Sequence, residues 1–507
     1  MMAKCGRRGE KTGDVPVLDV KVRNLGPVRK ADLQIKPFTV FIGPNNSGKS
    51  YLALMVHCII SNAVVIQRQL LYEVERIVLS HVRSRRKLLD LGPEKCLADA
   101  VVETWKRTFP DRMVELFACE SLEDLVSVGA SSMTVETLGV KLEIAKGNIG
   151  EDQLRVVPEG RDPWSLREFG ARMKKMFKEA EKVFGKYPPD RGLSSFMMLV
   201  ERELGPFMQK IIFAESSHYL PAGKCGILSS FEVLSAAAID LLQSALGWKE
   251  LRLPAFPGAI AEFIQALLMH RAQSGSDRRV SAVLENIVKD ITGGEVRLLS
   301  GQRGKPVEIK FIGEGYEIPI RRASSSISEI APVVFFVGLP EERRAPIRFP
   351  RYRFRGRETL LIIEEPEAHL DARNQVLFTR LLAFLVRNGV RVLITTHSDY
   401  VLEQVSNLVL CGMQDEKTKK KFARFTDGQE YVLPEEVSVY LMREGGRKHR
   451  WFDAVPVEIR EEGIAADHME EVKAQLYNEF VALWELQHAK TASAQETEER
   501  DQTEQAE

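Results

Sequence analysis

The octapeptide GPNNSGKS, Gly43–Ser50, constrains the fold of this chain more than any other part of its sequence. It fits the pattern G-x-x-x-x-G-K-[ST], and the apolar runs before and after it predict a strand, a loop and a helix. Gly43 and Gly48 allow the backbone to curl so that its N–H groups face phosphate oxygens, and the dipole of the following helix favours the same anion. A chance glycine-rich turn is the alternative, and the flanking pattern disfavours it.

The loop residues have separate expected roles in binding a nucleoside triphosphate. The Lys49 ammonium reaches the β- and γ-phosphates, and the Ser50 hydroxyl ligates Mg²⁺. ATP and Mg²⁺ are therefore the predicted ligands. The predicted nucleotide-binding residues of this loop are Gly43, Pro44, Asn45, Asn46, Ser47, Gly48, Lys49, Ser50 and Tyr51.

A second motif, LLIIEEPEAHLD at Leu360–Asp371, places two acids at the end of an apolar strand. Because side chains alternate along a strand, Glu364 and Glu365 are predicted to point in different directions. One carboxylate can then belong to the Mg²⁺ shell while the other orients a water for attack on the γ-phosphate. An acidic loop at a strand end is the alternative, which the phosphate-binding loop upstream disfavours.

A third motif, LITTHSD at Leu393–Asp399, ends another apolar strand in a histidine. A single histidine is more often structural than functional. Here the strand follows the acid pair by one helix, and the carboxyl ends of strands in such a sheet face the ligand crevice. His397 is therefore predicted to approach the γ-phosphate.

Composition limits the classes of protein to which the chain can belong. With 507 residues it is long enough for two or three domains. Lys+Arg and Asp+Glu are both 71, so a nucleic-acid surface would have to be a local patch. A hydrophobic fraction of 44% is too low for a polytopic membrane protein. The six cysteines form no CxxC pair and no secretory signal is predicted, which favours a reduced, cytoplasmic protein.

The remaining pattern predicts how strands and helices are distributed. Met133–Val157 predicts a hairpin and Val296–Ile320 a meander, whereas residues 67–210 are mostly helical in pattern. After residue 358, short apolar strands alternate with helices, which indicates a parallel sheet covered on both faces.

The three motifs, in this order, resemble those of the ABC-type ATPase head shared by the SMC and RecF proteins, and still more closely the OLD-like, AAA-type ATPases. VRNLGPVRKADLQIKPFTVFIGPNNSGKS resembles the strand-turn-strand lead-in of that family, EEPEAHLD its Walker B and D-loop, and TTHSDYVLEQVSNLV its switch-histidine segment. YLPAGKCGIL resembles a family segment with a basic residue, Lys224 in this chain. ASSSISEIAP stands where the family has its ABC signature.

The resemblance implies a role for each matching residue. Glu364 would be the Mg²⁺-side acid, Glu365 the catalytic base and His397 the γ-phosphate sensor, while Asp371 would be the D-loop acid. The signature would contact ATP bound to the opposite subunit of a head-to-tail homodimer, through Ser325, Ser326 and Glu329.

The resemblance also implies a fold, an α/β P-loop NTPase with the ABC-ATPase head layout, a large insertion and a small cap. Residues 17–60 and 321–410 would be the two parts of the ATPase domain and would meet in one sheet. The other expected regions are a disordered arm at 1–16, a mainly helical insertion with some strands at 61–320, a C-terminal α+β cap at 411–490 and a disordered acidic tail at 491–507.

The sequence departs from the family pattern at several points. The signature segment is not LSGGQ, and the first acid of the pair is Glu rather than Asp. The Q-loop glutamine is unassigned, with Gln67 and Gln69 as candidates. Residues 411–490 are too short for the TOPRIM nuclease domain of the OLD nucleases and lack a DxD motif on a strand. An ATPase without its own nuclease is therefore expected.

Two classes of function stay open. One is a dimerising, ATP-hydrolysing switch that acts on DNA or on a partner effector, in repair or phage defence. The other is a regulatory module that binds ATP with little turnover and recruits a separately encoded nuclease or toxin. A transport ATPase is disfavoured because no membrane segment is predicted. Two basic runs, Arg343–Arg357 and Lys417–Arg424, are candidates for nucleic-acid contact, although solvated loops are the preferred interpretation of both.

Overall fold

The structure is a computed structural model that divides into two compact units, residues 1–456 and 457–507. Of the expected disordered arm at 1–16, the structure describes only Val15. The expected disordered tail at 491–507, both Q-loop candidates and the arginine run at 343–357 lie outside the residues that the structure describes. The described residues are 15, 17–63, 65, 76, 93–147, 154–158, 175, 178–179, 213–214, 216–230, 258–269, 278–299, 308–337, 359–446, 450–464 and 474–485.

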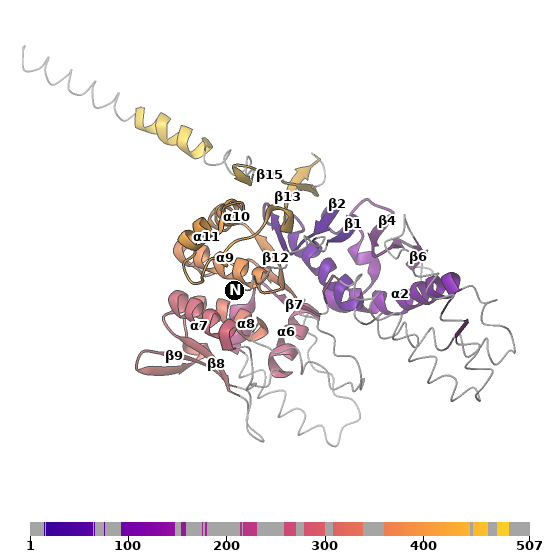
Figure 1. Ribbon diagram of the computed structural model, residues 1–507. Helices are drawn as coiled ribbons and strands as arrows, with labels where there is room; N and C mark the ends of the chain where they lie inside the picture. The colour runs from indigo at the N-terminus through magenta and orange to yellow at the C-terminus, as the bar shows by residue number, and fades with distance from the viewer. Residues whose placement is uncertain are drawn as a thin grey trace, which may run out of the picture. The chain divides into compact units, whose positions relative to one another are not determined.

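One large mixed sheet dominates the described part of the first unit (Figure 1). Its eleven described strands lie in the order β6-β5-β4-β1-β2-β14-β13-β3-β12-β11-β7. In chain order the strands are β1 (Leu18–Leu25), β2 (Val28–Ile35), β3 (Phe38–Ile42), β4 (Ser132–Thr137), β5 (Val140–Ala145), β6 (Leu154–Pro158), β7 (Ser216–Leu220), β11 (Thr359–Glu364), β12 (Val390–Thr396), β13 (Val437–Gly445) and β14 (Trp451–Pro456).

The strands that precede the three sequence motifs form the parallel part of this sheet. β3, β12, β11 and β7 pair in parallel in that order, and the residues of β3 and β11 are all buried. Ile42 pairs with Thr396, and Glu364 pairs with Thr395. The carboxyl ends of β3, β12 and β11 are therefore level, and the halves 17–60 and 321–410 meet in one sheet, as expected.

The other end of the sheet is antiparallel. β1 and β2 form a hairpin in which buried and exposed residues largely alternate, and β4 pairs with the free side of β1. The hairpin predicted at Met133–Val157 is confirmed as β4 and β5, and β6 adds a third strand to it. Trp105, Phe109 and Met113 of α2 (Pro93–Phe117) belong to the hydrophobic cluster that these strands bury. The region expected as an insertion thus extends the central sheet.

The expectation of a separate cap at 411–490 is wrong for its strands. β13 pairs in parallel with β3, and β14 pairs in parallel with β2, so both lie between strands of the N-terminal segment. Val437 and Val439 of β13 are buried to 1% and 2% exposure, as core residues are. A strand in the middle of a sheet forms backbone hydrogen bonds on both of its sides, whereas a strand at the edge of a separate cap would form them on one side only. An apolar strand such as β13 is therefore more stable inside the central sheet.

Two helices that follow strands cover the parallel part of the sheet. α9 (Ala372–Arg387) follows β11 and packs on β12, and α10 (Asp399–Gly412) follows β12 and packs on α9. Both begin with a side-chain cap, since Asp371 accepts a hydrogen bond from the Asn374 N–H and Ser398 from the Val401 N–H. A further helix, over residues 49–63, starts directly after the loop that follows β3.

A smaller sheet lies with the helices α7 and α8 (Figure 1). Its strands pair in the order β10-β9-β8, which confirms the meander predicted at Val296–Ile320. α7 also packs on α9, and α6 packs on both β7 and α2. The elements of this group are α6 (Gly258–Met269), α7 (Arg278–Thr292), β8 (Glu295–Leu299), β9 (Glu308–Gly313), β10 (Tyr316–Pro319), η5 (Ile320–Arg322) and α8 (Ser325–Val337).

Short elements complete the described chain. In the first unit they are η2 (Leu122–Leu125), α11 (Glu416–Phe422) and η7 (Pro434–Glu436). The second unit contains the two-stranded pair β15 (Ile459–Arg460) and β16 (Gly463–Ile464), and a helix over residues 474–485. Within the described residues, no helix has the length and apolar character needed to cross a membrane.

Candidate nucleotide-binding site

The loop between β3 and the helix at 49–63 has the backbone shape that its two glycines permit. Gly43 has φ 141° and Gly48 has φ 92°, in the left-handed region that side chains disfavour. A Cβ atom at Gly43 would lie 2.8 Å from the Cβ of Met442, and one at Gly48 would collide with Val28. Both glycines are therefore required by close packing of the loop on β13 and β2, as well as by its curvature.

Lys49 lies under this loop with 6% of its surface exposed. Its ammonium donates hydrogen bonds to the carbonyl oxygens of Gly43 at 2.9 Å and Pro44 at 2.8 Å. Burial lowers the pKa of Lys49 to about 8, while the nearby carboxylates Glu365, Glu367 and Glu364 act to raise it. The ammonium is thus held by two carbonyl oxygens and is poorly solvated, which favours an added anionic partner.

The two acids at the end of β11 lie in different environments. The Glu364 residue is 8% exposed, and its carboxylate accepts a hydrogen bond from the Ala222 N–H at 3.0 Å. The Glu365 side chain is 44% exposed, and its Oε1 lies 3.7 Å from Nε2 of His397. The two side chains diverge as expected, but strand alternation is not the cause, because Glu365 lies one residue beyond the end of β11. Glu365 also has φ 44°, a left-handed conformation that costs of order 1–3 kcal/mol at a residue other than glycine.

His397 follows the last residue of β12 and lies close to the phosphate-binding loop. Burial lowers the pKa of His397, and the positive charge of Lys49 lowers it further. Glu365, Glu367 and a hydrogen bond to the Gly43 backbone act in the opposite direction. A lowered pKa favours the neutral imidazole near neutral pH, which can donate or accept one proton.

Glu367 is a residue of this site that the sequence motifs did not single out. Its Oε1 accepts hydrogen bonds from the Thr396 hydroxyl at 2.8 Å and from the His397 N–H at 2.6 Å. It therefore connects the loop after β11 to the end of β12 and positions the backbone of His397. The sequence feature that could have identified Glu367 is its position as the third acid of EEPE, two residues after Glu365.

The serines of the signature-like segment and Glu329 lie in different surroundings. Ser325 is exposed and Ser326 is partly buried at the start of α8. Glu329 is 1% exposed and its Oε2 lies 2.5 Å from Nζ of Lys224, which is also 1% exposed. The expectation that Glu329 contacts ATP on another subunit is therefore not met, because a buried ion pair within the chain occupies it.

The Glu329–Lys224 pair also contacts the end of β11. The Lys224 ammonium donates a hydrogen bond to the Glu364 carbonyl oxygen at 3.0 Å. Ala222, in the same segment after β7, donates to the Glu364 side chain. The segment 221–230 thus joins α8 to the acid pair within one chain.

Asp371 and the second basic run have local partners. Asp371 caps α9, accepting from the Asn374 N–H at 3.1 Å and from its side-chain amide at 2.7 Å.

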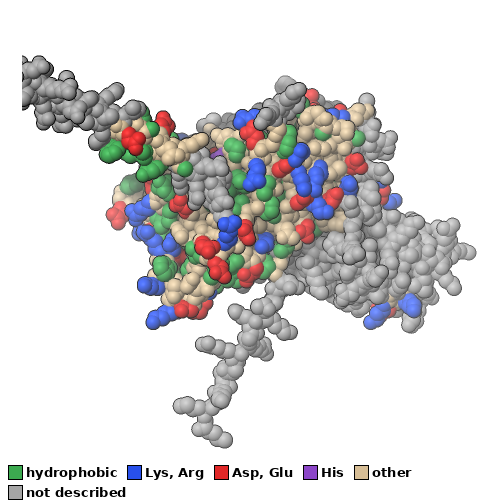
Figure 2. All heavy atoms as spheres, turned by 90° about the horizontal axis from the view of Figure 1, so that it is seen from above, with side chains coloured by type: hydrophobic (Ala, Val, Ile, Leu, Met, Phe, Trp, Pro, Cys, Tyr) green, Lys and Arg blue, Asp and Glu red, His purple; other side chains and the backbone are tan. Residues whose placement is uncertain are grey.

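In α11, Lys420 pairs with Asp427 at 2.8 Å, and the Lys419 ammonium lies 4.3 Å from the centre of the Tyr431 ring. On the face in Figure 2, basic and acidic side chains are interspersed. The solvated turn expected at Lys417–Arg424 is therefore wrong in part: residues up to Phe422 belong to helix α11, and Lys419 is 9% exposed.

Comparison with known proteins supports an ATPase. Residues 253–402 match the AAA ATPase domain model AAA_15, a span that contains the acid pair and His397 and begins after the phosphate-binding loop. No curated protein matches the sequence. Because β3 and β12 are neighbours in one sheet, the loop at Gly43–Ser50 and the matched span belong to the same structural unit.

Three solved structures show distant likeness to the chain. An SMC head bound to the C-winged helix domain of ScpA has 11% identity and a TM-score of 0.38, covering 87% of this chain and 98% of that one. The SMC head with an extended coiled coil from Pyrococcus furiosus has 11% identity and a TM-score of 0.35, covering 90% and 99%. The SMC head domain from Thermotoga maritima has 12% identity and a TM-score of 0.33, covering 87% and 99%.

Proposed function

We propose that this chain binds ATP with Mg²⁺ and hydrolyses it at the carboxyl ends of β3, β11 and β12. One observation carries the proposal: the parallel register brings Lys49, the acid pair and His397 to one edge of the sheet, close enough for their charges to act on one another. Carboxylates, an ammonium and an imidazole beside a phosphate-binding loop are the groups that phosphoryl transfer to water requires.

The chain offers suitable oxygen ligands for Mg²⁺, which prefers hard donors. Ser50 is exposed at the start of the helix. The Ala222 N–H donates a hydrogen bond to Oε2 of Glu364, so Oε1 is the carboxylate oxygen proposed to ligate Mg²⁺. Mg²⁺ held by these residues and the phosphates would neutralise charge on the transferred group. In this assignment the buried Glu364 is a ligand residue.

Glu365 is proposed as the general base that accepts a proton from the attacking water. It is the exposed member of the acid pair, and its strained backbone directs the carboxylate toward His397. His397, being neutral, would donate a hydrogen bond to the γ-phosphate rather than hold a fixed positive charge. Lys49 would leave the carbonyl oxygens of Gly43 and Pro44 when phosphate oxygens replace them.

A head-to-tail homodimer is proposed as the active form, with DNA or a separately encoded effector as its target. Ser325 and Ser326 support it, because Ser325 is exposed and Ser326 partly exposed at the start of α8, where they could contact a nucleotide on a second subunit. Asp371, exposed at the start of α9, is a further candidate for that interface. Hydrolysis would then loosen the dimer and act as a switch.

ATP turnover by the purified chain, with and without double-stranded DNA, tests the proposal. We expect Lys49→Ala to lose ATP binding, and Glu365→Gln to bind ATP with turnover reduced at least about 100-fold. Lys106→Ala and Glu103→Gln, exposed positions on α2, are matched controls that should keep turnover. Turnover by Glu365→Gln equal to that of the unaltered chain would refute the assigned base.

A second candidate is the regulatory module that binds ATP without turnover. It needs only the phosphate-binding loop, which is formed in the structure with the Lys49 ammonium bonded to the Gly43 and Pro44 carbonyl oxygens. In that case ATP would cause dimerisation measurable by light scattering, with no phosphate release. DNA-stimulated turnover would exclude it.

A further inference from the structure

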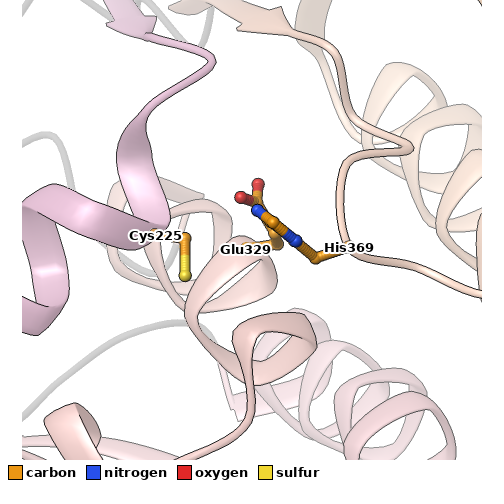
Figure 3. Close-up of side chains that lie close together, drawn as sticks. All are labelled: Cys225, Glu329 and His369. Carbon is orange, nitrogen blue, oxygen red and sulfur yellow. The ribbon is translucent and has the colours of Figure 1, made fainter.

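Cys225, Glu329 and His369 lie close together outside the residues assigned to the nucleotide (Figure 3). Each offers one ligand atom, and these three atoms all lie within 4.8 Å of one another. They come from the helical segment 224–230, from α8 and from the loop after β11. Glu329 is buried, Cys225 is partly buried and His369 is exposed, so the group is reachable from solvent on one side.

We propose that these three side chains form a binding site for a thiophilic divalent cation, with Zn²⁺ as the expected ion. Zn²⁺ takes thiolate, imidazole and carboxylate ligands at about 2.0–2.3 Å in a tetrahedral arrangement, with a water in the fourth position where the protein provides three. Ligand atoms in such a site are about 3–4 Å apart, so a small approach of the three side chains completes it. Mg²⁺ and Ca²⁺ are disfavoured because both prefer oxygen ligands to sulfur.

The Glu329 carboxylate supplies an independent reason for a cation at this place. Its Oε1 is buried and accepts no hydrogen bond from the residues that the structure describes. A buried carboxylate oxygen without a partner is costly, and burial accordingly raises the pKa of Glu329. A cation held together with Cys225 and His369 would satisfy that oxygen.

Lys224 and Glu365 are charged groups near Glu329, and the positive charge of Lys224 must be reconciled with a bound dication. Its ammonium contacts Oε2 of Glu329 and the Glu364 carbonyl oxygen. A metal on Oε1 leaves both contacts in place. The Cys225 thiolate offsets one of the two charges of Zn²⁺. Because Glu329 already pairs with Lys224, the ion and its thiolate add one positive charge to this pair, and the nearby Glu365 carboxylate, whose charge acts on Glu329, opposes that charge.

Binding of Zn²⁺ would fasten together three segments that carry parts of the nucleotide site. Segment 221–230 holds Glu364, α8 begins with the accessible serines, and the loop that carries His369 also carries Glu365 and Glu367. The ion would therefore hold α8 against the end of β11 and stabilise the folded chain, with the gain increasing as the logarithm of the Zn²⁺ concentration divided by its dissociation constant.

The test uses the full chain, freed of metal with a chelator and kept in excess Mg²⁺. Addition of Co²⁺, a spectroscopic substitute for Zn²⁺, should produce a thiolate-to-metal charge-transfer band, and Zn²⁺ should displace Co²⁺ at one ion per chain. Cys225→Ser should abolish the band and weaken Zn²⁺ binding at least about tenfold. His369→Gln should weaken binding similarly while the band persists. Cys411→Ser, at another partly buried cysteine, is the matched control and should change neither.

Absence of a thiolate band, or a band that Cys225→Ser leaves intact, would overturn the proposal. His369 is exposed, so His369→Gln should fold even if Cys225→Ser does not, and circular dichroism checks both. Unchanged Zn²⁺ affinity in a folded His369→Gln chain would equally exclude this site. These readouts do not depend on ATP turnover, so they separate the cation site from the proposed ATPase activity.

Discussion

At the scale of single residues, the candidate site is a set of titratable side chains, and the charge of each one shifts the pKa of its neighbours. Lys49 lowers the pKa of His397, and three glutamates raise the pKa of Lys49. Because Lys49 is buried, its protonated form is less stable than it would be in water, and a bound anion would stabilise that form. Ligand binding and proton binding are therefore coupled at this residue.

The first prediction is that ATP binding takes up a proton above about pH 8. The pKa of Lys49 is lowered to about 8, and contact with phosphate raises it, so ammonium forms on binding. At about pH 9, uptake should approach one proton per ATP. Calorimetry in two buffers of different ionisation enthalpy measures it. Lys49→Arg, whose charge does not titrate in this range, should remove the uptake, and an unchanged value would contradict the prediction.

The second prediction concerns Glu367 as a positioning residue for His397. Glu367→Gln keeps the size of the side chain but weakens its bonds to the Thr396 hydroxyl and the His397 N–H. Loss of a charged acceptor costs about 1.5–3 kcal/mol, so kcat should fall by about tenfold or more while ATP affinity changes little. The pKa of His397, followed by NMR, should also fall, because the Glu367 charge raises it. A chain with unchanged kcat and unchanged His397 titration would show that Glu367 is only structural.

At the scale of elements, a partly buried polar network joins the helix that begins at the phosphate-binding loop to its neighbours. His57 of that helix contacts the Ser217 hydroxyl of β7 through Nδ1 at 2.8 Å and the Glu262 carboxylate of α6 through Nε2 at 2.8 Å. Arg112 of α2 pairs with the same carboxylate. Desolvation opposes ionisation of Glu262, but His57 and Arg112 outweigh it and lower its pKa to about 2.

The third prediction is that Glu262→Gln destabilises the chain by about 1–3 kcal/mol, because it leaves His57 and Arg112 without their charged partner. The folded pKa is below the unfolded one, so this contribution is fully present above about pH 4.5 and is lost as the pH falls toward about 2. Denaturant unfolding at about pH 7 measures the difference, with Glu103→Gln as the exposed control. A difference below about 0.5 kcal/mol would show that the network adds no stability.

At the scale of the whole molecule, the central sheet is closed by strands from distant parts of the chain. β13 and β14 lie between β3 and β2, although about 400 residues separate them in sequence. Removing them would expose unpaired backbone on both β2 and β3 beside the phosphate-binding loop. Residues 457–507 form the second unit and contribute no described strand to this sheet.

The fourth prediction follows from this arrangement. A chain that ends at residue 456 should fold and bind ATP, whereas one that ends at residue 436 should aggregate or lose ATP binding. Gel filtration and circular dichroism compare the two products, and nucleotide titration measures binding. A monodisperse, ATP-binding product ending at residue 436 would show that β13 and β14 are dispensable for the core.

The sequence by itself determined the functional motifs whose residues lie within one continuous segment. The loop at Gly43–Ser50, the acids after an apolar strand and the strand-ending His397 were predicted because their residue types and spacing lie within single segments. The meander β8–β10 was predicted from its alternating pattern. That the segments carrying β3 and β12 meet in one sheet was expected from the family resemblance, and their direct pairing is seen only in the structure.

Only the tertiary structure decided which distant segments meet. The burial of Glu329 against Lys224, the contact of Glu367 with His397, and the grouping of Cys225 with His369 each join residues that no local spacing relates. β13 lacks a local signal of its place in the sheet, since an apolar strand pairs equally well with any neighbour of compatible burial. The physical reason is that strand partners and ion-pair partners are selected by the packing of the whole chain. The periodicity of residues along the sequence carries no information about that packing.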